Sequence, residues 1–175
     1  ILSIALNYAN NKSYYEQDHF KLMPHVRNTI ERGKLITSEQ YIQALTKLYE
    51  LRDYISSLFI NYDFIATPTS AFTANKCDEK HIVENGKLKI VKMTKEDKFI
   101  ENDMDYSSWN FACKQFTALF NWSGNPGASI PSGFTKYNMP VGLQIVGAKE
   151  NEVGVLQASR VFELEKPWQN KRPII

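Results

Sequence analysis

The sequence predicts an α/β protein in which helices cover a β-sheet. Segments whose apolar residues recur every three or four positions alternate along the chain with short apolar runs bounded by glycine and proline. The first pattern is typical of amphipathic helices and the second of buried strands. The composition, 43% hydrophobic and 23% charged over 175 residues, is that of an ordinary globular domain. Helices and strands in this alternating order form layered α/β folds.

The clearest helix is predicted over residues 37–63, "TSEQYIQALTKLYELRDYISSLFINYD". Thr37 and Gln40 have the spacing of a capping box, in which each side chain bonds a backbone amide at the helix start. An earlier helix is predicted within residues 19–33, broken at its proline and closed by Gly33 as a C-terminal cap. The apolar face of the long helix consists of Tyr41, Leu45, Leu48, Leu51, Ile55 and Leu58.

A short strand is predicted at "FIATPTS", residues 64–70, and it should end at its proline because proline cannot donate to a sheet. Residues 71–105 are polar and charged, which indicates an excursion over the surface of the domain. Asn85 and Gly86 stand between alternating apolar residues, the pattern of a tight β-hairpin. The excursion is therefore expected to carry a hairpin of its own.

The C-terminal part is predicted to hold a helix at residues 106–121, strands at 127–134 and 140–147 joined by a turn near Asn138, and a helix at 151–165. In the first of these helices the apolar residues at helical spacing are Trp109, Ala112, Cys113, Phe116 and Leu119. In the second, the residues predicted to be buried are Val155, Leu156, Ala158, Val161 and Phe162.

Composition and motifs exclude several classes of function. A net charge of +2 and a pI near 8.4, with no cluster of Lys and Arg, do not fit nucleic-acid binding. The sequence predicts neither a membrane span nor a secretory signal. No histidine has a partner at metal-ligand spacing, and no phosphate loop or dinucleotide motif occurs, so neither a metal nor a cofactor is predicted. The cysteines, Cys77 and Cys113, are typical of free thiols, which predicts a cytoplasmic location.

Two neighbouring stretches are dense in glycine and proline: "FNWSGNPGASIPSGF" at residues 120–134 and "PVGLQIVG" at 140–147. In this order they resemble the C-terminal signature of the amidase signature family. Upstream, "ERGKLITSEQYIQA", "LRDYISSLF" and "YDFIATPTS" are similar to that family in order and spacing. The resemblance omits only residues 75–105 or so. It implies that residues 1–175 are the C-terminal segment of a single amidase domain, in an α/β/α layered fold with a mixed β-sheet.

The resemblance also implies a hydrolase that cleaves carboxamide C–N bonds with a Ser–cis-Ser–Lys triad inside a Gly/Ser-rich block. This sequence has no such block, so no catalytic residue is assigned in it. The serine nucleophile is expected in the N-terminal portion of the same protein or in a partner chain. Residue 1 is Ile, and the residues after it read like the middle of an element, which indicates a piece of something longer. A homo-oligomer also fits, because a partial sheet leaves unpaired edges.

By their place in the family, five residues are candidates for contact with a small-molecule amide substrate: Thr67, Thr69, Phe116, Thr117 and Asn121. Each also has an ordinary structural interpretation, as a strand end or as part of a helical core. In the glutamine-using branch, the A-type subunits of tRNA-dependent amidotransferases, an acidic residue stands where this chain has Lys114. That difference favours neutral or acidic carboxamides over glutamine. Two alternatives stay open: a truncated or split-gene fragment that acts only as a binding partner, and an A-type amidotransferase subunit.

Overall fold

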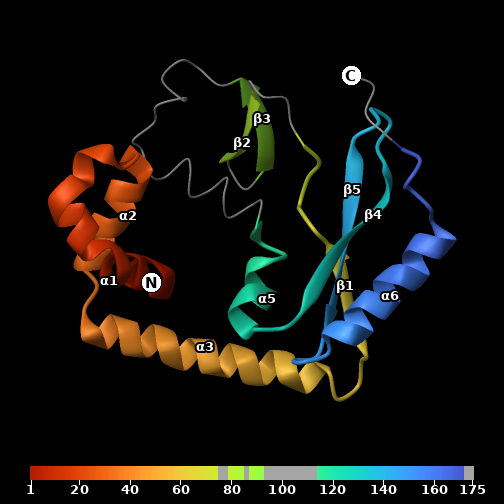
Figure 1. Ribbon diagram of the computed structural model, residues 1–175, viewed down its shortest axis with the longest axis horizontal. Coiled ribbons are helices and arrows are strands. Elements are labelled where there is room, and N and C mark those ends of the chain that lie inside the picture. The colour runs from red at the N-terminus through yellow and green to blue at the C-terminus, as the bar shows by residue number, and fades with distance from the viewer. Residues whose placement is uncertain (75–78, 85–86, 93–113, 172–175) are drawn as a thin grey trace. The chain divides into compact units, whose positions relative to one another are not determined.

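Figure 1 shows the chain as a computed structural model. The structure describes residues 1–74, 79–84, 87–92 and 114–171. Helices and strands alternate along this part of the chain, so the predicted α/β class is confirmed.

The chain divides into two compact units. The first comprises Ile1–Glu50 with Cys77–Trp109, and the second comprises Leu51–Lys76 with Asn110–Ile175. The long helix α3 (Ser38–Leu58) begins in the first unit and ends in the second.

In the first unit, α1 (Leu2–Asp18) packs against α2 (Pro24–Lys34), and the short 3-10 turn η1 (His19–Lys21) lies between them in sequence. The predicted break falls at Pro24, in the first turn of α2, where a missing amide hydrogen leaves no helical bond unmade. Ile30 of α2 is buried, with 1% of its surface exposed.

Gly33 lies inside α2 and does not cap it, so the role predicted for it is wrong. The helix continues to Lys34. A Cβ on Gly33 would lie 2.6 Å from Tyr8 Cβ and would also meet the carbonyl oxygen of Ile4. The glycine is therefore explained by the close approach of α1 and α2 and not by helix termination.

The excursion carries an antiparallel ribbon of β2 (Glu79–Glu84) and β3 (Lys87–Lys92). Glu84 pairs with Lys87 across the turn, so the predicted hairpin is confirmed. The Asn-Gly pair itself lies outside the described residues, as does Cys77. The surface position predicted for the excursion stays a prediction for the same reason.

The start of α3 has the predicted capping box. Thr37 N donates to Gln40 Oε1 over 3.1 Å, and Gln40 N donates to Thr37 Oγ1 over 3.2 Å. Along the predicted apolar face Ile55 is buried and the other members are half-buried, so the face is confirmed. The helix ends at Leu58, several residues before the predicted end, where turn hydrogen bonds replace helical ones.

The second unit is built on a three-stranded sheet with the order β1 (Phe64–Pro68), β5 (Pro140–Gly147), β4 (Gly127–Phe134). All three strands were predicted, and Asn138, with a φ of 59°, lies in the predicted turn between the last two. Both strand pairs are antiparallel. Among the described strands there is therefore no parallel pair of the kind that a mixed sheet implies.

One face of the sheet is covered by the end of α3 and by α5 (Ala118–Ser123). Ile55, Phe120 and Val146 form the buried cluster there, and Ile65 of β1 packs against it. These side chains come from two helices and two strands, so the hydrophobic effect holds this layer together.

The helix predicted at residues 106–121 is confirmed only at its end. Residues 115–117 form a turn, and α5 follows it. Gly124, with a φ of 81°, ends α5 because glycine adopts the left-handed conformation without a Cβ clash. The predicted positions that lie outside the described residues are Trp109, Ala112 and Cys113.

The last helix, α6 (Glu152–Glu165), packs against β4 and β5 on the other face of the sheet. Val155 contacts Gly147, whose added Cβ would lie 2.8 Å from Val155 Cγ2. Successive strand residues point to opposite faces, so Gly147 and Val146 face different layers. The second unit is thus a helix–sheet–helix sandwich (Figure 1).

The buried face of α6 differs from the predicted one. Leu156 and Val161 are 66% and 62% exposed, so their predicted burial is wrong. Ser159 is buried instead, because it lies one turn after Val155 and its hydroxyl donates to the Val155 carbonyl oxygen over 2.7 Å. The prediction holds for Val155, which is buried, and for Ala158 and Phe162, which are half-buried.

Candidate functional site

A row of polar side chains crosses the sheet on the face that α3 and α5 cover. Thr67 of β1 pairs with Gln144 of β5, and Gln144 pairs with Ser129 of β4. Residues opposite each other in antiparallel strands project from the same face. Val146, two positions along β5, belongs to the buried cluster on that face, so the polar row borders the apolar core.

Gln144 is the centre of the row and is only 6% exposed. Its Nε2 donates to Thr67 Oγ1 over 2.9 Å and to the carbonyl oxygen of Phe116 over 3.0 Å. A backbone carbonyl can only accept, so the contact with Phe116 fixes which end of the side-chain amide is nitrogen. The Gln144 side chain thus links β5 to β1 and to the turn before α5.

Next to this row lies a pair of hydroxyl groups. Thr69 Oγ1 and Ser129 Oγ are 2.7 Å apart and share a hydrogen bond. An added Cβ on Gly142 would lie 2.7 Å from Thr69 Oγ1 and 3.1 Å from Ser129 Oγ. Glycine at this position therefore makes room for the hydroxyl pair.

The structure brings three of the five candidate residues together. Thr67 and the backbone of Phe116 meet at Gln144. Thr69 lies two positions after Thr67, on the same side of the chain, and its amide donates to the Gly142 carbonyl oxygen over 3.0 Å. These residues form one polar corner of the sheet.

The other two candidates are the residue before α5 and a residue within it. Thr117 precedes the helix, and its hydroxyl donates to the carbonyl oxygen of Lys114 over 3.3 Å. Asn121 is exposed, and its backbone N–H donates to the Thr117 carbonyl oxygen. The Lys114 side chain is exposed as well. Within the described residues, no hydrogen bond joins these three side chains to the polar row.

Sequence reasoning missed Gln144 and Ser129. The signal for Gln144 was present, since it is the lone polar side chain within "VGLQIVG", a run that reads as a buried strand. A buried amide is retained only where it finds hydrogen-bond partners. Ser129 had no comparable signal, because its role depends on Thr69, which is distant in sequence.

Side-chain hydrogen bonds among the described residues include those of Ser57, Ser123, Ser129, Ser132 and Ser159. Their partners are backbone carbonyl oxygens, the side chain of Asn125 or the hydroxyl of Thr69, and none is a lysine. In the same part of the chain no group of His, Cys, Asp and Glu could hold a metal ion. No described helix is both long enough and apolar enough to cross a membrane.

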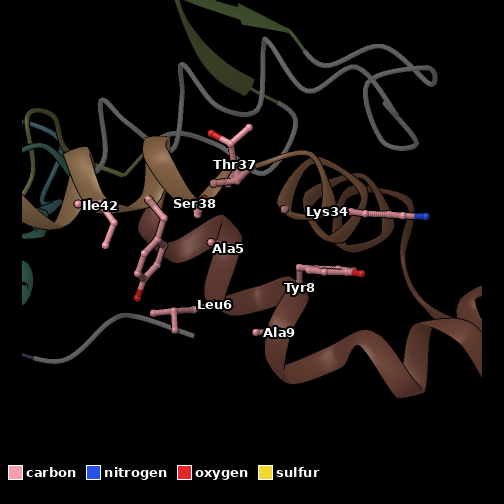
Figure 2. A pocket seen from close by; sticks show the side chains of 11 residues that line it. Ala5, Leu6, Tyr8, Ala9, Lys34, Thr37, Ser38 and Ile42 are labelled. Atoms are coloured by element: carbon pink, nitrogen blue, oxygen red, sulfur yellow. The ribbon is translucent and has the colours of Figure 1, made fainter.

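A groove of about 380 Å³ lies in the first unit, between α1, the end of α2 and the start of α3 (Figure 2). Its lining is largely apolar, with the phenol rings of Tyr8 and Tyr41 among it. Lys34 is the charged residue of the lining, and in Figure 2 its side chain extends away from the other labelled residues. No candidate site residue lines this groove.

The family of the chain follows from its sequence match. The family model described as Amidase matches residues 6–156. The chain belongs to the amidase signature family. That membership confirms the resemblance stated above, although it does not place the chain within the full amidase domain.

Curated relatives are considerably longer than this chain. The A-type subunit of the glutamyl-tRNA(Gln) amidotransferase of Thermodesulfovibrio yellowstonii is 28% identical over 155 residues, which are 86% of this chain and 27% of the relative. The lipoamidase of Enterococcus faecalis is 26% identical over 82% of this chain and 21% of its own length. The chain thus spans about a quarter of the length of the relatives it matches.

Solved structures agree on the fold. A 6-aminohexanoate cyclic dimer hydrolase matches with a TM-score of 0.70 and 20% identity, over 98% of this chain and 34% of the other. A bacterial aryl acylamidase of the amidase signature family matches with a TM-score of 0.66 and 21% identity, over the same shares. At these identities the likeness concerns the fold alone.

Proposed function

We propose that the chain is the C-terminal part of an amidase signature hydrolase that cleaves carboxamide C–N bonds, with the serine nucleophile outside the chain. The observation that carries the proposal is the family match over residues 6–156 in a chain that spans 27% and 21% of two relatives. Serine catalysis needs a nearby base and fixed donors for the oxyanion. Among the described residues, none of the serine hydrogen bonds given above joins such a base, and in this proposal another segment supplies both the nucleophile and its base.

Two surface features support a role for a further segment. In the described sheet β5 is central, so β1 and β4 each have one unpaired edge. On α6, four apolar side chains are at least 62% exposed, and they are Val153, Leu156, Val161 and Leu164. Open strand edges and apolar helix faces favour association with more protein. In this proposal the partner is the N-terminal catalytic portion of the protein, a separate chain or a second copy.

In this proposal the polar corner forms part of the wall that holds the amide substrate. Thr67, Thr69 and Phe116 contribute from the sheet and from the turn before α5, and Thr117 and Asn121 contribute from α5. Polar side chains on a largely buried face are costly unless they bond each other or a ligand, and the bonds of Gln144 with Thr67 and of Thr69 with Ser129 hold this corner in one arrangement. The chain then orients the amide, while the other segment attacks it.

A second candidate is the A-type subunit of a tRNA-dependent amidotransferase. The relative with 28% identity carries that name, which favours the candidate. Lys114 disfavours it, because a cation there opposes the ammonium group of glutamine.

The test is an ammonia-release assay with short carboxamides. The chain is assayed alone and fused to the remaining part of the Enterococcus faecalis lipoamidase. We expect ammonia only from the fusion, and loss of release when the supplied serine is changed to alanine. Ammonia from the chain alone would contradict the proposal. A folded fusion without activity would favour the binding-segment alternative.

A further inference from the structure

Within the part of the chain that the structure describes, the hydrogen-bonding capacity of Gln144 is only partly used. Both hydrogens of its Nε2 have acceptors, Thr67 Oγ1 and the Phe116 carbonyl oxygen. No described residue donates to its Oε1. Gln144 Oε1 is therefore an acceptor for which the described residues supply no donor.

A buried acceptor such as Gln144 Oε1 is expected to accept a hydrogen bond. An amide oxygen has two lone pairs, and Gln144 is only 6% exposed. A buried acceptor without a partner is unfavourable, whereas an apolar residue of the same length would avoid that cost. The oxygen is thus expected to meet a donor that comes from outside the described residues.

Thr67 supplies the complementary group beside it. Thr67 Oγ1 accepts from Gln144 Nε2, so its own hydrogen remains available for donation. No acceptor for that hydrogen occurs among the described residues. One acceptor and one donor therefore lie on neighbouring strands, held together by the bond between the two side chains.

We propose that Gln144 and Thr67 form a recognition pair for a carboxamide group. Gln144 Oε1 accepts the substrate N–H, and the Thr67 hydroxyl donates to the substrate carbonyl oxygen. The inference rests on the proposed function and narrows its substrates to amides with at least one N–H. A tertiary amide has no hydrogen for Gln144. A carboxylate would set an oxygen acceptor against Gln144 Oε1.

The test is a titration of the ¹⁵N-labelled 175-residue chain, followed by NMR at the side-chain amide signals of Gln144. The probes are butyramide, N,N-dimethylbutyramide and butyrate, which share one acyl chain. We expect butyramide to shift the Gln144 signals and to bind about tenfold more tightly than the other two, as for one neutral hydrogen bond. Equal binding of all three probes would overturn the proposal. So would the absence of any Gln144 shift up to the solubility limit of butyramide.

Variants of Thr67 separate recognition from folding. Thr67→Val removes the hydroxyl at nearly constant shape and should weaken butyramide binding about tenfold, whereas Thr67→Ser should restore it. The matched control is Thr46→Val, which removes a hydroxyl that bonds only the Ile42 carbonyl oxygen on α3. Unchanged binding in a folded Thr67→Val chain would overturn the proposal. If Thr67→Val does not fold, the probe series on the unaltered chain decides alone.

The ammonia-release assay keeps the inference and the proposed function apart. Butyramide binding at Gln144 without hydrolysis by the fusion supports the recognition pair while the proposed function fails. Hydrolysis that is insensitive to Thr67→Val overturns the recognition pair and leaves the proposed function in place.

Discussion

Gln144 Nε2 donates to the carbonyl oxygen of Phe116 over 3.0 Å, and this bond ties the central strand to the turn before α5. The bond joins residues 28 positions apart, on a side chain that is almost fully buried. The strand β5 is predicted by the sequence, whereas the turn at residues 115–117 lies where the sequence predicts a helix.

Replacing Gln144 by methionine should destabilise the chain by about 1–3 kcal/mol, because the Phe116 carbonyl and the Thr67 hydroxyl lose their donor. In chemical denaturation, the loss appears as a lower denaturant concentration at the midpoint of unfolding. The control is Gln157→Met on the exposed side of α6, which should leave the midpoint unchanged. Equal midpoints for the two variants would show that the Gln144 bonds do not stabilise the fold.

Gly142→Ala should destabilise the chain by about 1–3 kcal/mol, the cost of overpacking. The new Cβ would lie 2.7 Å from Thr69 Oγ1 and 2.9 Å from Thr69 Cβ. Gly127→Ala is the matched control, since its nearest neighbour would be at 3.6 Å. Adding Thr69→Ala should recover part of the loss, because it removes the closest atom. A Gly142→Ala chain as stable as the Gly127→Ala chain would contradict the close contact.

Tyr15 should make the stability of the first unit depend on pH. Its hydroxyl donates to Glu31 on α2, and this bond raises the pKa of Tyr15 above its usual value near 10. Because the pKa of Tyr15 is higher in the folded state than in the unfolded state, the bond stabilises the folded state fully at a pH below the unfolded-state pKa. This stabilisation is lost as the pH rises through the folded-state pKa. The melting temperature of wild type should thus exceed that of Tyr15→Phe near neutral pH, and the gap should close at alkaline pH.

The control for this prediction is Tyr14→Phe, an exposed neighbour on α1. Its melting temperature should follow that of wild type at every pH. A gap between wild type and Tyr15→Phe that stays constant through the alkaline range would show that ionisation of Tyr15 is not linked to folding.

Lys114→Asp in the fused enzyme should improve glutamine as a substrate. The change replaces a repulsion of the substrate ammonium by an attraction, and charges about 4 Å apart interact by roughly 1–4 kcal/mol between water and a protein surface. We expect KM for glutamine to fall by about tenfold or more, while butyramide hydrolysis stays the same. Lys149→Asp, another exposed position, should change neither substrate. A fall in KM with both variants would indicate a general effect of charge.

The strands and caps were readable from sequence because they depend on local chemistry. Thr37 and Gln40 lie three residues apart and satisfy each other's amides. Asn138 adopts a positive φ in the predicted turn between the last two strands. Such features need no knowledge of distant residues.

The predictions that were wrong concern contacts made across the fold. Gly33 was interpreted as a cap, yet it is required by Tyr8 on another helix. On α6, Val155 and Ser159 are buried, whereas Leu156 lies on the exposed side of the helix. A serine that bonds its own helix backbone can be buried, and hydrophobicity alone does not reveal that.

The candidate site was predictable only in part. Thr67, Thr69 and Phe116 were found through the family resemblance, and the structure places them at one corner of the sheet. Gln144 and Ser129 join them through strand register, which a single sequence does not fix.

The most direct test of a nucleophile outside this chain is mass spectrometry of the fused enzyme after treatment with a fluorophosphonate. Such a reagent forms a covalent adduct with an activated serine, because the serine displaces fluoride from phosphorus. We predict a single adduct on a serine of the supplied segment, blocked by prior incubation with a slowly hydrolysed amide. An adduct on any serine of these 175 residues, with ammonia release lost in parallel, would contradict the proposed division of labour.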